Sequence, residues 1–323
     1  MNSNLTIKEL SNLLISFDDI VIYAHQKPDG DAIGASLALQ SAYKAIGKRA
    51  VSYFEEPLPD KYSKFATTDT YFKDLPNWQN IKNCIVVDTG NIDRIALFSK
   101  INLPLINIDH HPDNHFFGLQ NYVNSDACAT SEIIFNIINF STKWKMTAKV
   151  ADSLLFGILM DTGGLRFANT NANVLKIASV LIESGADYHA IIKDLYFSEP
   201  LNLIKLQAEL ISNNLQLKFN SKFAYIYASD EILKKYGMTT KNIEGLIDSI
   251  RIIEGLSVAA IITDRDDFFK VSLRSCNNDI PVNGIAQKLS GGGHRLAAGC
   301  SIQAKTFAEA EKILLEHIAE ILK

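Results

Sequence analysis

The fold is decided by the stretch IVIYAHQKPDGDAIG, which occupies residues 20–34. Its first five residues form an apolar run, which is typical of a strand covered on both faces of a sheet. From Asp31 the apolar residues recur at helical spacing, and this pattern ends near Gly47. Pro28 and Gly30 favour a turn between the two segments. The stretch therefore predicts a β-strand that leads directly into an α-helix.

The same alternation of strand and helix continues through the first half of the chain. Apolar runs long enough for buried strands recur at residues 50–54, 84–87 and 105–108. Helical patterns follow at about residues 147–160 and 173–184. Strands that alternate with helices favour a parallel sheet, so we predict an α/β domain with a doubly wound, mostly parallel sheet.

The second half of the chain has the pattern of a smaller α/β domain. We expect strands at residues 223–227, 257–263 and 269–274, and helices at about residues 240–250, 283–289 and 307–322. The glycine-rich run at residues 290–294 is expected to be a loop, because three successive glycines suit neither regular element. The predicted organisation is an N-terminal domain at residues 1–189, a helical linker at residues 190–215 and a C-terminal domain at residues 216–323.

Composition and charge narrow the classes of ligand and the cellular location. Of the 323 residues, 47% are hydrophobic and 21% charged, which is typical of a globular protein without long disordered segments. The formal net charge of -4 argues against a protein that coats long nucleic acid, although it allows a small anionic ligand. The 4 cysteines show no paired spacing, and no apolar run has the roughly 18 residues of a membrane span. We therefore expect a cytoplasmic protein with reduced cysteines and no membrane partner.

Side chains that can bind metal follow three of the predicted strands, at the point where each strand ends. They are His25, Asp88, and the consecutive Asp109, His110 and His111. Because ligands of open α/β sheets bind outside the carboxyl ends of the strands, these side chains are expected to meet at one edge. Asp29 and Asp31 lie in the turn after the first strand. Asp161, at the end of a predicted helix, could join the same edge.

Several of these residues have a plainer interpretation when each is taken alone. Asp29 or Asp31 could cap the helix that follows, with His25 an incidental surface residue, and Asp88 could cap another helix. Asp161 could be an ordinary turn residue. Two imidazoles placed directly after an aspartate at a strand end have no capping or packing reason to be adjacent. Together, five carboxylates and three histidines at the ends of elements favour a metal site.

This set of side chains points to phosphoryl chemistry with two metal ions. Mixed carboxylate and imidazole ligands suit Mn²⁺ and similar ions, and a set without cysteine argues against structural zinc. Two ions roughly 3.5–4 Å apart that share a carboxylate promote in-line attack on phosphorus. In the C-terminal half, the backbone N–H groups of Gly291, Gly292 and Gly293 could bind an anion, with Arg274 and His294 as charged donors. The alternative for these glycines is a tight structural turn.

The chain contains six motifs, four in its N-terminal half and two in its C-terminal half, that occur in the same order as in a known family. They are residues 25–34, residues 86–90, the run Asp109-His110-His111-Pro112, residues 161–164, residues 270–275 and residues 291–299. Together they resemble the DHH phosphoesterases and their associated C-terminal domain, most closely the bacterial branch of oligoribonucleases and 3′-phosphoadenosine-5′-phosphate phosphatases. Two small departures from the family pattern, at Ala35 and Ser290, remove no ligand.

The resemblance implies a residue for each role in a two-metal active site. One Mn²⁺ would be held by His25, Asp29 and Asp88, and a second by Asp31, Asp88, His110 and Asp161, so that Asp88 is shared. Asp109 would orient a histidine, and His111 would contact the phosphate or the leaving oxygen. The substrate would lie in a cleft between the domains, bound by Arg274, Ser275, Gly291, Gly292, Gly293 and His294. Mg²⁺ or Co²⁺ could replace Mn²⁺, and dimers are common among relatives, which leaves a homodimer open.

The resemblance also implies the substrates. They are short oligoribonucleotides, which would give nucleoside 5′-monophosphates, and 3′-phosphoadenosine 5′-phosphate, which would give AMP. The nearest alternative is the hydrolysis of linear pApA or pGpG, or of cyclic dinucleotides, in second-messenger turnover. An inorganic polyphosphatase or pyrophosphatase is disfavoured, because those relatives lack the Arg-Ser and glycine-histidine motifs. A non-catalytic nucleotide sensor is disfavoured by the intact set of ligands.

Overall fold

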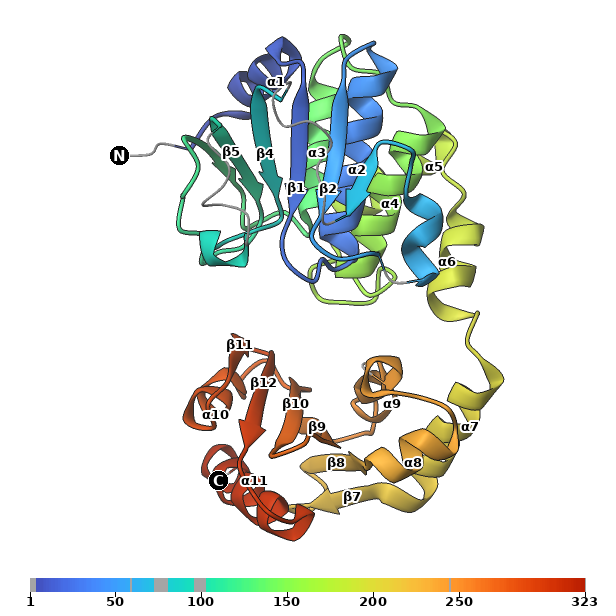
Figure 1. Ribbon diagram of the computed structural model, residues 1–323, viewed down its shortest axis with the longest axis vertical. Coiled ribbons are helices and arrows are strands. Elements are labelled where there is room, and N and C mark those ends of the chain that lie inside the picture. The colour runs from blue at the N-terminus through green and yellow to red at the C-terminus, as the bar shows by residue number, and fades with distance from the viewer. Residues whose placement is uncertain (1–3, 59, 73–80, 96–102, 244, 323) are drawn as a thin grey trace. The chain divides into compact units, whose positions relative to one another are not determined.

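The computed structural model describes residues 4–58, 60–72, 81–95, 103–243 and 245–322 (Figure 1). The chain forms two compact units, Met1–Ser198 and Glu199–Lys323. Each unit combines α-helices with one six-stranded sheet, which confirms the predicted α/β class. No helix of the described residues is long and apolar enough to cross a membrane.

The N-terminal sheet is parallel throughout, as the alternation of strands and helices predicts. Its strands lie in the order β3-β2-β1-β4-β5-β6. They are β1 (Ile20–Ala24), β2 (Ala50–Phe54), β3 (Thr70–Phe72), β4 (Asn83–Val87), β5 (Leu105–Asp109) and β6 (Gln120–Val123). Alternate residues of β1 belong to two different apolar clusters, since Ile22 packs into one and Tyr23 into the other. The continuous apolar run of β1 thus reflects burial on both faces.

Six α-helices accompany this sheet among the described residues. They are α1 (Ile7–Ser16), α2 (Gly30–Ala45), α3 (Thr130–Phe140), α4 (Ala148–Asp161), α5 (Ala172–Glu183) and α6 (Tyr188–Tyr196). Figure 1 shows α2, α3 and α4 together on one face of the sheet. Their apolar side chains form the larger of the two clusters around the sheet. The sequence patterns predicted α2, α4 and α5 but not α1 or α3.

Two glycines let α2, α3 and α4 approach one another closely. A Cβ atom on Gly34 of α2 would lie 2.6 Å from the carbonyl oxygen of Ser153 in α4. A Cβ atom on Gly157 of α4 would lie 2.8 Å from Oδ1 of Asp31 and would collide with Oγ of Ser131. Any larger residue would force the helices apart. This close packing brings the first turns of α2 and α3 into contact, and Asp31 lies there.

The C-terminal sheet has the order β11-β12-β10-β9-β8-β7, with only β8 and β9 parallel. Its strands are β7 (Leu215–Lys218), β8 (Phe223–Ala228), β9 (Val258–Asp264), β10 (Phe269–Ser275), β11 (Gly292–His294) and β12 (Ala297–Ile302). Its α-helices are α7 (Leu201–Glu209), α8 (Asp230–Lys235), α9 (Leu246–Ile250), α10 (Asn283–Lys288) and α11 (Phe307–Ile321). Apolar clusters cover both faces. The predicted strands and helices of this half agree closely with β8, β9, β10, α10 and α11.

Three expectations about local structure differ from what the structure shows. Residues 190–215 do not form one linking helix, because α6 ends at Tyr196 and α7 begins after Pro200. Proline has no N–H to donate and disfavours helical backbone in the residue before it, so the helix breaks there. The glycine run is not only a loop, since Gly292–His294 pairs with β12 as an edge strand. The segment predicted as a helix at 240–250 also divides into a 3₁₀ turn and α9.

The four cysteines are unpaired, as their spacing predicts. Cys84, Cys128 and Cys300 are buried, and Cys276 is partly exposed. Burial raises the pKa of the Cys84 thiol to about 12 and that of Cys300 to about 11, so both remain protonated packing residues.

Candidate metal centre

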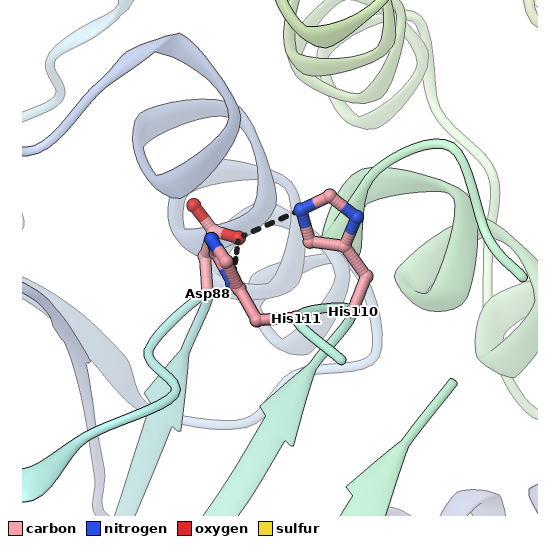
Figure 2. Close-up of side chains that lie close together, drawn as sticks. All are labelled: Asp88, His110 and His111. Atoms are coloured by element: carbon pink, nitrogen blue, oxygen red, sulfur yellow. Dashed lines mark ion pairs between the residues drawn. The ribbon is translucent and has the colours of Figure 1, made fainter. Parts of the chain in front are cut away.

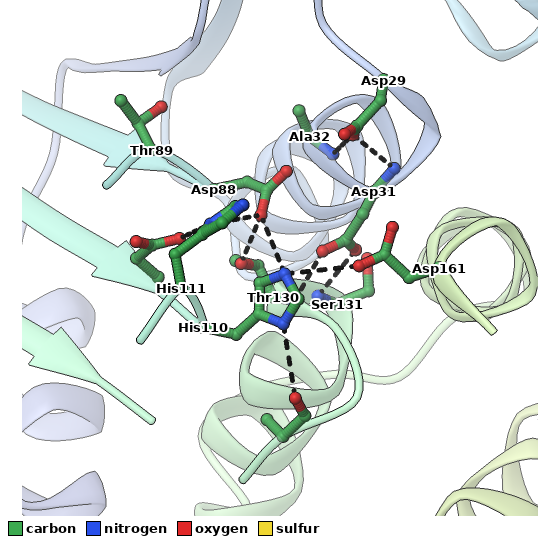
Figure 3. Close-up of polar contacts among 12 residues, drawn as sticks. Asp29, Asp31, Ala32, Asp88, Thr89, His110, His111, Thr130, Ser131 and Asp161 are labelled. Atoms are coloured by element: carbon green, nitrogen blue, oxygen red, sulfur yellow. Dashed lines mark hydrogen bonds and ion pairs between the residues drawn. The ribbon is translucent and has the colours of Figure 1, made fainter. Parts of the chain in front are cut away.

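The strand ends of the N-terminal unit bring the predicted metal ligands together (Figure 3). Three groups each have their ligand atoms within 4.8 Å of one another: His25, Asp29 and Asp88; Asp88, His110 and His111; and Asp31, His110 and Asp161. The groups share Asp88 and His110, so they form one continuous cluster. It is built from the ends of β1, β4 and β5, the first turn of α2 and the last residue of α4.

Asp88 lies at the centre of the cluster, directly after β4, and is 1% exposed. Its Oδ1 lies 3.6 Å from Nε2 of His110 (Figure 2). Its Oδ2 lies 3.9 Å from Nε2 of His25. Thr130 donates a hydrogen bond of 2.9 Å from Oγ1 to Oδ1. Burial, and then the charges of Asp31 and other neighbouring carboxylates, raise the pKa of Asp88 well above its ordinary value. Two oxygens that face different imidazoles suit a carboxylate shared by two ions.

The backbone of Asp88 is also unusual, with a φ of 56°. This left-handed conformation is costly for residues other than glycine and persists only where the surrounding structure enforces it. No helix among the described residues begins at Asp88, so capping does not explain the residue. The residue with this conformation is the one at the end of β4 whose carboxylate lies close to both His25 and His110.

Asp31 is fully buried in the first turn of α2, and it caps a helix other than its own. Its Oδ2 accepts a hydrogen bond of 2.5 Å from the backbone N–H of Thr130, and its Oδ1 accepts one of 3.0 Å from Ser131. These two donors begin α3, whose own N-cap residue, Ala129, makes no side-chain hydrogen bond. Burial raises the pKa of Asp31. The carboxylate is therefore oriented before any ion binds.

The capping interpretation holds for Asp29. Its Oδ1 accepts hydrogen bonds of 3.1 Å from the backbone N–H groups of Asp31 and Ala32 at the start of α2. The same side chain lies with His25 and Asp88 in one of the groups that could hold an ion. Capping and metal binding are compatible here, because a carboxylate has two oxygens.

Asp161 and His110 form a second side of the cluster. Oδ2 of Asp161 lies 3.3 Å from Nε2 of His110, and the carbonyl oxygen of Ala127 lies 3.3 Å from the other ring nitrogen. Asp161 is the last residue of α4, where the negative end of the helix dipole disfavours a carboxylate. Burial, followed by the charges of Asp31 and Asp29, raises the pKa of Asp161 well above its ordinary value. A nearby cation would stabilise the charged carboxylate against both the helix dipole and its buried, acidic surroundings. An ordinary turn aspartate would not need such a cation.

Asp109 contacts His111 rather than the centre of the cluster. Its Oδ1 lies 2.7 Å from Nδ1 of His111, and its Oδ2 accepts a hydrogen bond of 2.6 Å from Asn114. Burial opposes ionisation of Asp109, but the hydrogen bonds of His111 and Asn114 outweigh it and lower its pKa. Burial likewise opposes the charge on His111, yet Asp109 raises the pKa of the imidazole overall. This pair fixes the orientation of the His111 ring.

Sequence patterns missed three residues that shape the cluster: Arg94, Asn114 and Thr130. Nη2 of Arg94 lies 2.8 Å from Nδ1 of His25, and the charge of Arg94 adds to burial in lowering the pKa of His25. Asn114 and Thr130 bind the carboxylates of Asp109 and Asp88. None of the three lies at a recognisable position of a strand or helix pattern, so only the tertiary structure identifies them.

The predicted substrate-binding residues of the C-terminal unit, apart from Gly291, lie on two strands, β10 and β11, that both pair with β12. Arg274 and Ser275 end β10, and Gly292, Gly293 and the backbone of His294 form β11. In the sheet register Arg274 pairs with Ala297 of β12, and Ala297 pairs with His294. Arg274, Ala297 and His294 therefore occupy directly paired backbone positions on the three strands. Burial lowers the pKa of Arg274, which remains a cation at neutral pH.

Gly291, Gly292 and Gly293 differ in whether the local structure requires a glycine. A Cβ atom on Gly291 would collide with the carbonyl oxygen of Gly299, and Gly293 has a φ of 136° that favours glycine. Gly292 is exposed and has open space around it. The structural alternative therefore explains Gly291 and Gly293, while Gly292 is available to a ligand.

The donor set of the N-terminal cluster fits divalent cations. Its candidate ligands are aspartate oxygens and histidine nitrogens, which suit hard and intermediate divalent ions. Several buried carboxylates raise one another's pKa by mutual repulsion. Because bound cations would offset this like charge, the cluster is a candidate metal centre.

Comparison with known proteins gives two domain matches and near full-length relatives. Residues 19–158 match the DHH family, N-terminal domain, and residues 220–323 match the DHHA1 domain. The chain is 31% identical over 312 residues to the bifunctional oligoribonuclease and PAP phosphatase NrnA of Thermus thermophilus, covering 94% of this chain and 90% of the relative. It is 31% identical over 316 residues to the protein of the same description from Bacillus subtilis, covering 95% and 96%.

A solved structure shows a similar fold. An exopolyphosphatase-related protein from Bacteroides fragilis matches with a TM-score of 0.89 and 24% identity, covering 98% of this chain and 96% of that one. At this identity the likeness supports the fold, which agrees with the parallel N-terminal sheet and the mixed C-terminal sheet described above.

Proposed function

This chain belongs to the DHH family of phosphoesterases, and we propose that it uses two Mn²⁺ ions to hydrolyse small nucleotides. The proposed substrates are short oligoribonucleotides, cleaved to nucleoside 5′-monophosphates, and 3′-phosphoadenosine 5′-phosphate, cleaved to AMP. Two relatives at 31% identity carry the description of oligoribonuclease and PAP phosphatase, which supports this choice. The acidic composition also favours small substrates over long nucleic acid.

The observation that carries the proposal is the position of Asp88. Its two carboxylate oxygens face His25 on one side and His110 on the other, in a buried site with further carboxylates around it. We assign one ion to His25, Asp29 and Asp88, and the second to Asp31, Asp88, His110 and Asp161. When bound, the two ions would supply an activated water and would offset charge on the non-bridging phosphate oxygens.

The remaining residues of the centre would act on the substrate itself. Asp109 holds His111 through a hydrogen bond of 2.7 Å, which fixes the ring orientation, and we propose that the imidazole contacts a phosphate or leaving oxygen. An imidazole positioned in this way can donate a proton to the leaving group. In the C-terminal unit, we propose that Arg274, Ser275, Gly291, Gly292, Gly293 and His294 bind the substrate, with Arg274 as a charged donor.

A panel of substrates tests the proposal. Purified protein with Mn²⁺ should release nucleoside monophosphates from dinucleotides and other short RNA, and phosphate from 3′-phosphoadenosine 5′-phosphate. Removal of the metal with a chelator should stop both reactions, and Mg²⁺ or Co²⁺ should be tried as replacements. The exposed Asp126 provides a matched control, since Asp126→Ala removes a carboxylate that lies outside the candidate metal groups.

The panel also separates the alternatives. Faster cleavage of pApA or pGpG than of other RNA or 3′-phosphoadenosine 5′-phosphate would assign the chain to dinucleotide second-messenger turnover. Faster release of phosphate from pyrophosphate would assign it to inorganic substrates. Tight nucleotide binding without any hydrolysis would identify a sensor and contradict the enzymatic proposal.

A further inference from the structure

One buried acid next to the metal centre is not among the candidate ligands. Glu132 is the third residue of α3 and is 6% exposed. Its Oε2 accepts a hydrogen bond of 2.8 Å from the backbone N–H of Cys128, and its Oε1 accepts one of 2.8 Å from Nδ2 of Asn173 in α5. A glutamate at this helical position commonly bonds the N–H of the N-cap residue. Here it reaches one residue further back, and it joins the start of α3 to α5.

The segment that Glu132 holds, residues 127–131, contacts the candidate metal ligands directly. The backbone N–H groups of Thr130 and Ser131 donate to the two oxygens of Asp31. The hydroxyl of Thr130 donates to Asp88. One turn of chain thus orients both carboxylates, which come from β4 and α2.

The same segment also contacts the other side of the centre. The carbonyl oxygen of Ala127 lies 3.3 Å from Nδ1 of His110. Nδ2 of Asn169 donates hydrogen bonds of 3.1 Å to the carbonyl oxygens of Cys128 and Asp161. Residues 127–131 therefore contact the side chains of Asp31, Asp88 and His110 directly. They also bind Asn169, which holds the backbone of Asp161, so all four ligands proposed for the second ion depend on this segment.

This segment needs a support other than the ligands. Ala129, the N-cap of α3, has extended backbone and makes no side-chain hydrogen bond. Asp31 contacts the next two residues, but its oxygens are also the ones proposed to bind metal. Glu132 supplies a second anchor through the N–H of Cys128, and the positive end of the helix dipole favours its carboxylate there.

We propose that Glu132, held by Asn173, is a positioning residue of the metal centre. By fixing residues 127–131 it sets the orientation of Asp31, Asp88 and His110 before the ions bind. This inference rests on the metal sites assigned in the proposed function. Residues that orient metal ligands typically change metal affinity by about 10–100-fold when they are replaced.

Glu132→Gln is the direct test. A glutamine carries no charge and has one acceptor oxygen in place of two, so the charge-assisted hydrogen bonds from the N–H of Cys128 and from Asn173 are replaced by weaker neutral ones. We expect the affinity for Mn²⁺, measured by calorimetry or by electron paramagnetic resonance of free Mn²⁺, to fall roughly 10–100-fold. Circular dichroism below the melting temperature should show a folded protein.

A second change should restore binding. In Glu132→Gln with Asn173→Asp, the glutamine NH₂ group can donate to the new carboxylate, so a charge-assisted hydrogen bond between the two positions returns with the charge on the other partner. Asn173→Asp alone places two carboxylates together and should weaken Mn²⁺ binding. Recovery of Mn²⁺ affinity in the double variant would show that residues 132 and 173 act through each other. A general loss of stability would not give such a recovery. Glu183→Gln, which changes an exposed glutamate of α5, is the matched control and should bind Mn²⁺ normally.

The outcomes separate this inference from its premise. A wild-type protein that binds no divalent ion would overturn the proposed function and this inference with it. Wild-type affinity in folded Glu132→Gln would overturn the positioning role alone. Equal loss of affinity in the single and double variants would also overturn it, and this comparison remains decisive if Glu132→Gln is less stable.

Discussion

The candidate metal ligands of the N-terminal unit gather around two buried carboxylates, whereas the glycine-rich segment proposed to bind substrate in the C-terminal unit lies at the edge of a sheet. Asp31 and Asp88 are buried and accept hydrogen bonds from Thr130, which belongs to a different element from either. Gly292, in contrast, is exposed in β11, the last strand of its sheet.

The difference reflects two physical tasks. A metal centre must gather like charges that repel one another, so the fold has to hold them with hydrogen bonds in a buried position. A surface that binds a phosphate needs accessible backbone N–H groups and cations, and an edge strand provides unpaired N–H groups. Substitutions in the two regions should therefore affect different measured quantities.

The largest expected effect is at the shared carboxylate. Asp88→Asn should lower kcat by about 10³-fold or more, because loss of about 4 kcal/mol of transition-state stabilisation gives that factor. Asparagine tolerates the left-handed backbone of Asp88 better than alanine, so it is the better variant. The metal-free variant should melt at the same or a higher temperature than wild type, because a buried charge with a raised pKa is removed. Undiminished turnover would refute the bridging role.

A second effect links pH, metal and stability. Burial and mutual repulsion raise the pKa of Asp31, Asp88 and Asp161 in the folded state. The folded state then binds protons that the unfolded chain has released, so the metal-free protein should lose stability as pH rises above about 4, the ordinary range of aspartate.

Mn²⁺ should reverse this loss. At pH 7.5, a Mn²⁺ concentration of about 100 times the Kd adds about 2.7 kcal/mol to the free energy of unfolding. The same Mn²⁺ concentration should add less at pH 5.5, because protons compete with the ion for the carboxylates. Melting curves with Mn²⁺ and with a chelator at both pH values measure it. If the gain in the free energy of unfolding does not depend on pH, the raised pKa values of the clustered carboxylates are contradicted.

Two neighbouring glycines sharpen the contrast within the C-terminal unit. Gly291→Ala should destabilise the fold by about 1–3 kcal/mol, because the new methyl group meets the backbone of Gly299. Gly292→Ala should change the free energy of unfolding by less than about 0.5 kcal/mol, since the space around it is open. If β11 binds substrate, Gly292→Ala should nevertheless raise KM. Denaturant titration and steady-state kinetics on a dinucleotide separate the two outcomes.

The smallest expected effect is at His294. His294→Ala should raise KM for dinucleotides about tenfold, which corresponds to loss of about 1.4 kcal/mol from one charged hydrogen bond. Mn²⁺ affinity should not change, because the candidate ligands all belong to the N-terminal unit. An unchanged KM would remove His294 from the proposed substrate-binding residues, and weaker Mn²⁺ binding would contradict the division of tasks between the two regions.

Sequence patterns predicted the strands that position the centre, because β1, β2, β4 and β5 carry apolar runs with a strong local signal. The short edge strand β3 and the partly polar β6 carry little of this signal and were not predicted. The break at Pro200 and the pairing of Gly292 with Gly299 were also missed. A glycine-rich strand has no side-chain pattern, so only its partner strand reveals it.

The sequence by itself determined the parallel α/β fold, the family and the set of candidate metal ligands, because strand periodicity and the residues at strand ends are local features of the chain. The tertiary structure decided which atoms meet: that Asp31 caps α3, that Asp109 orients His111, and that Glu132 accepts a hydrogen bond from Cys128 at the start of α3. These contacts join residues as far as 100 positions apart in the chain. Their geometry follows from helix packing at Gly34 and Gly157, which no local pattern encodes.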